Sequence, residues 1–155
     1  MNVLIAYATN SGSTFEVANK ISEMVTGAGH QVTVKNFQEI PSADEFGNYD
    51  VVLLGSPSWD YQGNEGFPHD DFMAFKDNNA SADLGGKNFV VFGLGDSQGY
   101  QHFCGAVAHI EDYVKEHNGN LKAESLRIDG YYNDMEAGNA AVEGWVNGTL
   151  VPALS

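Results

Sequence analysis

Short runs of consecutive apolar residues recur along the chain. They cover residues 3–7 (Val-Leu-Ile-Ala-Tyr), 51–55 (Val-Val-Leu-Leu-Gly) and 89–93 (Phe-Val-Val-Phe-Gly). A strand that is buried on both faces has this continuous pattern, as in a parallel sheet covered by helices. The alternating residues 30–37 predict a second, more exposed strand, and residues 121–128 predict a fifth strand.

Apolar residues at helical spacing follow these runs and predict helices between the strands. The members are Val17, Ala18, Ile21, Met24 and Val25, then Val107, Ile110, Tyr113 and Val114, and finally Ala140, Ala141, Trp145 and Val146 in a tail helix over residues 136–154. Alternating strands and helices are typical of βαβ units. We therefore predict one α/β domain over residues 1–155, with five strands and about five helices.

Three of the apolar strands run directly into polar, glycine-containing segments. These segments are residues 9–14, 56–66 and 93–99, and we expect them to be loops. In an open parallel sheet such loops leave the carboxyl ends of the strands, where ligands bind at the topological switch point. The pattern therefore predicts one ligand site at this edge of the sheet.

The segment Thr9-Asn10-Ser11-Gly12-Ser13-Thr14 has the composition of a phosphate-binding turn. Five of its six residues are Thr, Ser or Asn, and it runs into a predicted helix N-terminus, whose free amides and positive dipole end attract anions. It contains neither the lysine of a Walker loop nor the G-x-G-x-x-G pattern of a dinucleotide fold. The segment therefore fits a phosphomonoester better than a nucleoside triphosphate or NAD. A phosphate site also explains its composition better than an ordinary helix cap without a ligand does.

The other two segments each carry an aromatic residue. Trp59 follows the third predicted strand and Tyr100 follows the fourth, and neither belongs to an apolar periodic pattern. Flat aromatic side chains suit stacking on a planar ring. Tyr131 and Tyr132 follow the fifth strand, and the sequence does not decide whether they pack internally or face a partner.

The chain of 155 residues carries 21 acidic and 7 basic side chains, a formal net charge of −14. Such a surface repels phosphate backbones and anionic lipid, so we expect no nucleic-acid or membrane binding. The single cysteine excludes an internal disulfide and a multi-cysteine metal site, and the five histidines lack metal-ligand spacing, so we predict no metal site. No secretory signal or membrane-spanning run is visible, so we expect a cytoplasmic protein.

These segments resemble the flavodoxin family. The first is similar to its [TS]-x-[TS]-G-x-T phosphate loop, and Phe103-Cys104-Gly105-Ala106-Val107 and Leu126-Arg127-Ile128-Asp129-Gly130 are similar to short-chain members. The resemblance implies a three-layer sandwich with a five-stranded parallel sheet in the order 2-1-3-4-5 and helices on both faces. It also implies non-covalently bound FMN. The positions implied for the cofactor are Thr9, Asn10, Ser11, Gly12, Ser13, Thr14, Pro57, Ser58, Trp59, Asp60, Tyr61, Leu94, Gly95, Asp96, Tyr100, Phe103 and Cys104.

Within this set the resemblance assigns separate roles. Trp59 and Tyr100 would stack on the flavin ring, Ser58 would add a hydroxyl towards the phosphate, and backbone groups of the segments around Gly95 and Cys104 would bind the pyrimidine edge. Asp60 stands where short-chain members often have glycine. A residue with a side chain makes a positive φ at this position more costly than glycine does. The flavin loops look like those of long-chain members, yet the chain has no room for the loop that splits the last strand in that subclass.

Eight acids and no Lys or Arg lie between Lys35 and Lys76. A negative field near the ring disfavours an anionic reduced flavin and steers basic partners towards the site. We therefore expect a monomeric, low-potential one-electron carrier rather than an enzyme, shuttling between semiquinone and hydroquinone, with no catalytic residues and with basic-surfaced donor and acceptor proteins.

Three other functions remain open at this point. One is an FMN-dependent NAD(P)H:quinone oxidoreductase of the same fold, which would leave one ring face open. Another is a flavoprotein dedicated to activating ribonucleotide reductase. The third is a flavin-free signalling or binding module, although Thr9-Asn10-Ser11 and Ser56-Pro57-Ser58 lack the acids of a receiver domain.

Overall fold

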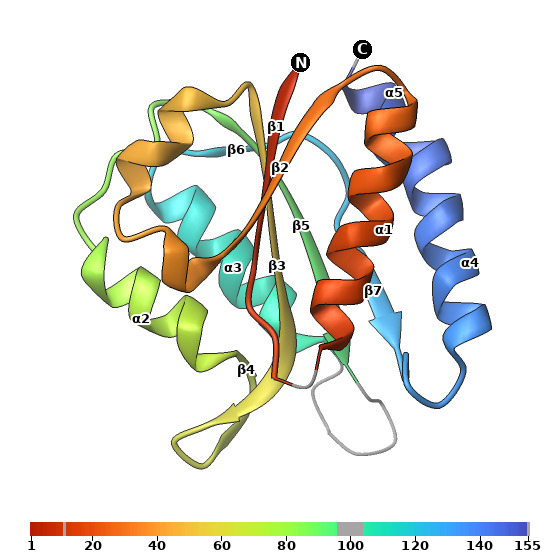
Figure 1. Cartoon of the computed structure of the whole chain (residues 1–155). Helices are drawn as coiled ribbons and strands as arrows, with labels where there is room; N and C mark the ends of the chain where they lie inside the picture. Colours follow the sequence, from red (N-terminus) through yellow and green to blue (C-terminus); the bar gives the residue numbers. More distant parts are fainter. Residues whose placement is uncertain (11, 96–103, 155) are drawn as a thin grey trace.

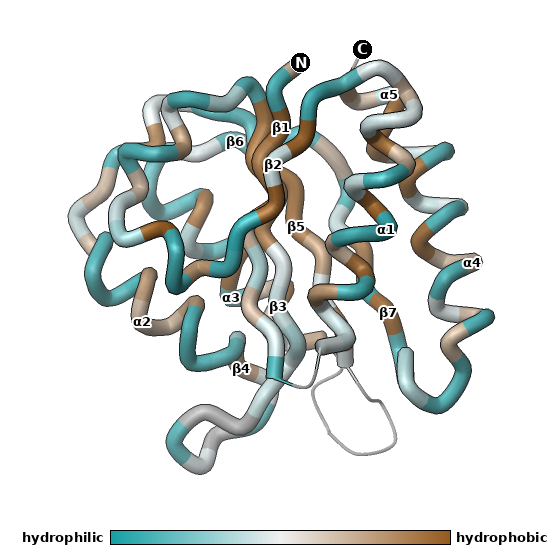
Figure 2. The backbone as a smooth tube through the Cα atoms, viewed as in Figure 1, coloured by the Kyte–Doolittle hydropathy of each residue, from teal (hydrophilic) through white to brown (hydrophobic). Residues whose placement is uncertain are grey.

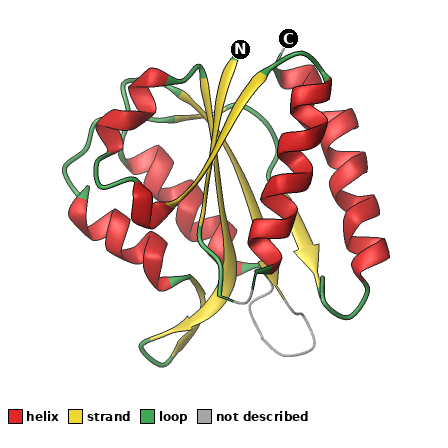
Figure 3. Ribbon diagram, in the orientation of Figure 1, coloured by secondary structure: helices red, strands yellow, loops and turns green. Residues whose placement is uncertain are grey.

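The computed structural model describes residues 1–10, 12–95 and 104–154, with the backbone alone at residues 60, 61 and 64. A central sheet lies between two layers of helices (Figures 1 and 3). The strands are β1 (Asn2–Tyr7), β2 (Gln31–Asn36), β3 (Val51–Tyr61), β4 (Asn64–Pro68), β5 (Asn88–Gly95), β6 (Asn120–Leu121) and β7 (Leu126–Asp129). The α-helices are α1 (Ser13–Gly27), α2 (Asp70–Asn78), α3 (Gly105–Glu116), α4 (Met135–Trp145) and α5 (Val151–Ala153). Short 3₁₀ helices cover Phe37–Glu39 and Ala43–Asn48.

The parallel strands follow the order β2-β1-β3-β5, and β6 and β7 both pair with the outer side of β5. Counting β6 and β7 as one interrupted strand, this is the predicted order 2-1-3-4-5, which is confirmed together with the α/β class. From β1 the chain continues to β2 on one side and then crosses to β3 on the other side of β1. The carboxyl ends of β1 and β3 therefore form the switch point at which the ligand site was predicted.

The core has two halves, one on each face of the sheet. Successive residues of a strand point to opposite faces, so Val3 and Ile5 pack against α1 and α4, whereas Leu4 and Ala6 pack against α2 and α3. All four are fully buried. Figure 2 shows the apolar residues gathered on the central strands and the polar ones on the outer helix faces. Burial on both faces is the reason these strands are continuously apolar.

The segment predicted as a loop over residues 56–66 is instead mostly a β-hairpin. Strand β3 continues to Tyr61, and β4 returns antiparallel to it, with Trp59 opposite Phe67. The two residues of the turn, Gln62 and Gly63, have φ values of 53° and 86°. A two-residue turn with two positive φ angles matches the twist of a hairpin, and glycine adopts it readily. The loop prediction was wrong because the polar end of β3 forms a ladder with β4 in spite of its composition.

The predicted fifth strand over residues 121–128 is also wrong as a single strand. Phe89 pairs with Leu121 but Phe92 pairs with Leu126, so four residues of this strand stand opposite two of β5. The surplus chain bulges away from the sheet. The indole of Trp145 donates a hydrogen bond to the exposed carbonyl of Glu124 at 2.8 Å, which satisfies a group that the ladder leaves unpaired.

The C-terminal residues 136–154 form one helical stretch, as predicted. Helix α4 passes into a π-helical turn over Val146–Leu150 and then into α5. No helix within the described ranges has the length and hydrophobicity that crossing a bilayer requires.

Candidate functional site

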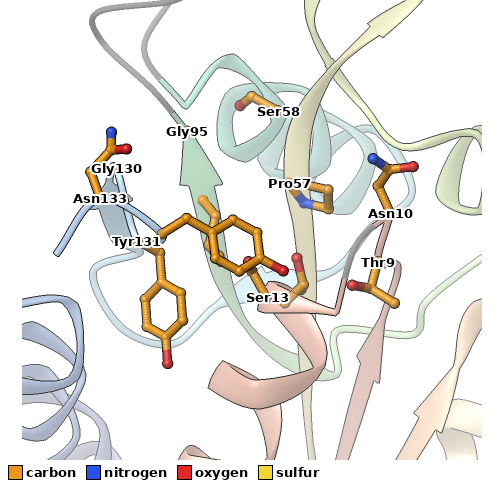
Figure 4. A pocket seen from close by; sticks show the side chains of 12 residues that line it. Thr9, Asn10, Ser13, Pro57, Ser58, Gly95, Gly130, Tyr131 and Asn133 are labelled. Atoms are coloured by element: carbon orange, nitrogen blue, oxygen red, sulfur yellow. The ribbon is translucent and has the colours of Figure 1, made fainter. Parts of the chain in front are cut away.

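A pocket of about 170 Å³ lies at the carboxyl edge of the sheet. Four segments that are distant in the sequence line it, as Figure 4 shows: the end of β1 with the start of α1, the middle of β3, the end of β5 and the turn after β7. The lining residues are Thr9, Asn10, Ser13, Thr14, Pro57, Ser58, Leu94, Gly95, Gly130, Tyr131, Tyr132 and Asn133. None of these side chains carries a charge near neutral pH.

The turn before α1 is shaped by Gly12. Its φ of 100° is in the left-handed region, and its amide donates a hydrogen bond of 2.9 Å to the hydroxyl of Thr9. A side chain at Gly12 would meet open space, so the backbone conformation rather than crowding requires glycine. The turn thereby brings the N-terminus of α1 to the pocket.

Two hydroxyl groups at this N-terminus lack a hydrogen-bond partner within the described part of the chain. Ser13 is 8% exposed and Thr14 is 1% exposed, and Ser13 Oγ and Thr14 Oγ1 are both buried. A buried hydroxyl without a partner costs free energy and is uncommon in folded proteins. The helix also presents amides that have no partner inside the helix. Together these donors form a cradle for an anion.

Strand β3 supplies the next part of the pocket. Ser58 is buried, and its Oγ accepts a hydrogen bond of 3.1 Å from the amide of Ala106 at the start of α3. Ser58 is also one of the residues that line the pocket. Trp59, the next residue, is partly buried, and its ring centroid lies 5.8 Å from that of His69.

The structure brings together eight of the residues singled out from the sequence. These pocket residues are Thr9, Asn10, Ser13, Thr14, Pro57, Ser58, Leu94 and Gly95. Gly12 forms the turn between them, whereas Trp59 and Cys104 are not among the lining residues of this pocket. Ser11, Asp96, Tyr100 and Phe103, and the side chains of Asp60 and Tyr61, lie outside the described residues.

The sequence analysis did not place the segment Gly130–Asn133 in the site. This segment reaches the pocket because the amide of Gly130 donates to the carbonyl of Gly95 at 2.8 Å. Tyr131 is buried and donates to Asn139 Oδ1 at 2.9 Å, whereas Tyr132 is 57% exposed. Burial, with Glu16 nearby, raises the pKa of the Tyr131 hydroxyl and so keeps it protonated. One sequence signal could have identified this segment. Gly130 comes just after a predicted strand whose carboxyl end lies at the same edge of the sheet as the other predicted loops.

Comparison with known proteins decides the family. The family model described as flavodoxin matches residues 5–144. The chain belongs to the flavodoxin family. It is 37% identical over 127 residues to the flavodoxin of Maridesulfovibrio salexigens, covering 82% of this chain and 85% of that protein. It is 32% identical over 154 residues to the flavodoxin of Nitratidesulfovibrio vulgaris, covering 99% of both.

A solved structure agrees with this placement. Oxidised flavodoxin 2 from Bacillus cereus superimposes with a TM-score of 0.81 at 30% identity, over 99% of this chain and 97% of that one. The three-layer arrangement predicted from the flavodoxin resemblance is therefore confirmed.

The start of α3 packs closely against the end of β5, which lines the pocket. Cys104 has a φ of 50° and precedes α3, and a side chain at Gly95 would come within 2.8 Å of its amide nitrogen. Its Sγ lies 3.8 Å from the carbonyl oxygen of Gly93 and 3.7 Å from that of Ile128. Burial raises the pKa of this thiol to about 12, so it stays protonated. A protonated, buried thiol is unsuited to nucleophilic catalysis.

We expect Cys104 to resist alkylation in the folded protein. A thiol with a pKa of about 12 has, at pH 8, about a thousandfold less thiolate than an unperturbed thiol. Iodoacetamide at pH 8, followed by mass spectrometry, should leave the native chain unmodified and modify the chain in guanidinium. Equal rates in the two conditions would contradict the buried position of Cys104.

Proposed function

We propose that this flavodoxin holds FMN non-covalently in the pocket and passes electrons, one at a time, between larger redox proteins. Flavodoxins are electron-transfer proteins. The observation that carries the proposal for these particular residues is the pair of buried hydroxyls, Ser13 Oγ and Thr14 Oγ1, that have no partner among the described groups. A phosphate oxygen at the start of α1 would supply the missing partner.

The cradle fits a phosphomonoester without any cationic side chain. Hydroxyls and backbone amides donate to the anion, and the dipole of the 15-residue helix α1 favours negative charge at its N-terminus. The same neutral lining disfavours a triphosphate, whose larger charge calls for lysine or a metal ion. The residues present therefore fit the phosphate end of FMN.

The remaining residues would orient the flavin. FMN supplies the one-electron chemistry when it is bound. Ser58 would donate towards the phosphate and ribityl chain, the backbone of Leu94 and Gly95 would face the pyrimidine edge, and the indole of Trp59 would cover one ring face. The family resemblance also implies cofactor contacts at Asp60, Tyr61, Asp96, Tyr100, Phe103 and Cys104.

The protein would act on other proteins rather than on a substrate of its own. The described residues that line the pocket offer no acid–base pair, which supports an electron carrier rather than an enzyme. The excess of acids, 21 against 7 basic side chains, supports partners with basic surfaces, because opposite charges speed encounter. We propose that residues 1–155 work as a single, monomeric, cytoplasmic domain, with a reductase as donor and separate acceptor enzymes.

The test is an FMN titration combined with anaerobic reduction of the loaded protein. We expect one FMN per chain, quenching of FMN fluorescence, and two separate one-electron steps in a potentiometric titration. NADH or NADPH alone should not reduce the loaded protein. Rapid reduction by either nucleotide would favour the quinone-oxidoreductase alternative instead, and failure to bind FMN would overturn the proposal.

A further inference from the structure

His69 joins the hairpin to helix α2. It directly follows β4 and precedes the first residue of α2. Its amide donates a hydrogen bond of 2.9 Å to Ser56 Oγ, and Ser56 is fully buried in the middle of the sheet. The backbone of His69 is therefore fixed relative to strand β3, which also carries Trp59.

The imidazole of His69 has a fixed orientation as well. Its Nδ1 accepts a hydrogen bond of 3.1 Å from the amide of Asp71, so the side chain caps the N-terminus of α2. The Asp71 carboxylate lies 3.7 Å from the same nitrogen, so the backbone and the side chain of Asp71 both face Nδ1. Asp71 is held in turn by Gln38, whose Nε2 lies 3.0 Å from the Asp71 carboxylate. The side chain of His69 is only 14% exposed.

This fixed ring packs against Trp59. The two ring centroids are 5.8 Å apart, with an angle of 48° between the planes. A tilted pair at this separation is an attractive aromatic contact. Trp59 lies close to the free end of the hairpin, beside a register shift between Trp59 and Tyr61. A contact from outside the hairpin therefore restricts the indole where the hairpin itself is irregular.

We propose that His69 is a positioning residue for Trp59. Its imidazole, which accepts the Asp71 amide, packs against the indole and restricts the orientations that Trp59 can take next to the site. The effect on FMN rests on the function proposed above, whereas the contact with Trp59 exists in the FMN-free protein. The side chain of His69 thereby connects the N-terminus of helix α2 to Trp59.

Two substitutions separate the ring from the cap. His69→Asn keeps a good capping side chain and removes the ring, whereas His69→Phe keeps a ring and removes the acceptor. FMN affinity should fall about two- to tenfold in His69→Asn and stay within about twofold of native in His69→Phe. The unfolding temperature should show the opposite order, close to native in His69→Asn and lower in His69→Phe.

Acrylamide quenching of tryptophan fluorescence in the FMN-free protein gives a second readout. The Trp59→Phe variant identifies the part of the signal that comes from Trp59. The other tryptophan, Trp145, is only 9% exposed, so acrylamide should quench it little. Quenching of Trp59 should increase in His69→Asn and remain near native in His69→Phe. Native FMN affinity and native quenching in His69→Asn would overturn the positioning role. If the native protein bound no FMN, the proposed function would fail, while the quenching data would still decide the role of His69.

Discussion

Replacing Ser13 with Ala and Thr14 with Val together should weaken FMN binding by about a hundredfold or more. A hydrogen bond to a charged group contributes about 1.5–3 kcal/mol, and the double variant removes two such donors from the phosphate. The free energy of unfolding of the FMN-free protein should stay equal or rise, because both hydroxyls are buried without a partner among the described groups. FMN fluorescence titration and urea unfolding of the FMN-free protein measure the two quantities.

The same helix offers a matched control. Ser22→Ala with Thr26→Val makes the same chemical changes near the opposite end of α1, where Ser22 is partly exposed and Thr26 is exposed. FMN affinity should be unchanged in this control. If the control and the Ser13/Thr14 variant lost affinity equally, the loss would come from the helix as a whole. Native affinity in the Ser13/Thr14 variant would remove both hydroxyls from the phosphate site.

Gly105→Ala should lower the free energy of unfolding by about 1–3 kcal/mol and also weaken FMN binding. A Cβ at Gly105 would come within 3.0 Å of the Cα of Gly66 and closer still to the Gly66 carbonyl oxygen. Backbone atoms cannot rotate away as a side chain can, so the hairpin must move from α3, at the cost typical of overpacking. That movement stretches the hydrogen bond from Ala106 to Ser58 and displaces Trp59. Chemical denaturation and FMN titration measure the two effects.

Gly144→Ala is the control for a methyl group added to a glycine. Gly144 lies on an exposed face of α4, and a Cβ there would meet nothing within 4 Å. Because alanine is the better helix former, this variant should gain up to about 1 kcal/mol and bind FMN as the native protein does. If Gly105→Ala were as stable as Gly144→Ala, the close approach of the hairpin to α3 would be disproved.

The sequence alone determined the central strands and the edge at which the site lies. A strand covered on both faces must be apolar at consecutive positions, and β1, β3 and β5 contain such runs. The polar turn at Thr9–Thr14 was identifiable because a phosphate cradle needs small hydroxyl residues next to a helix start. These features depend on residues adjacent in the chain, so their signals are local.

Only the tertiary structure decided which distant groups meet. The hairpin with the Gln62-Gly63 turn can pack against α3 because α3 begins with Gly105, which leaves room for the backbone of Gly66. The break between β6 and β7 is tolerated because Trp145, in α4, reaches the carbonyl of Glu124. The contact of His69 with Trp59 likewise depends on the pairing of β4 with β3, in which Pro68 lies opposite Ser58. Each of these contacts joins residues that only folding brings together, so no local pattern specifies them.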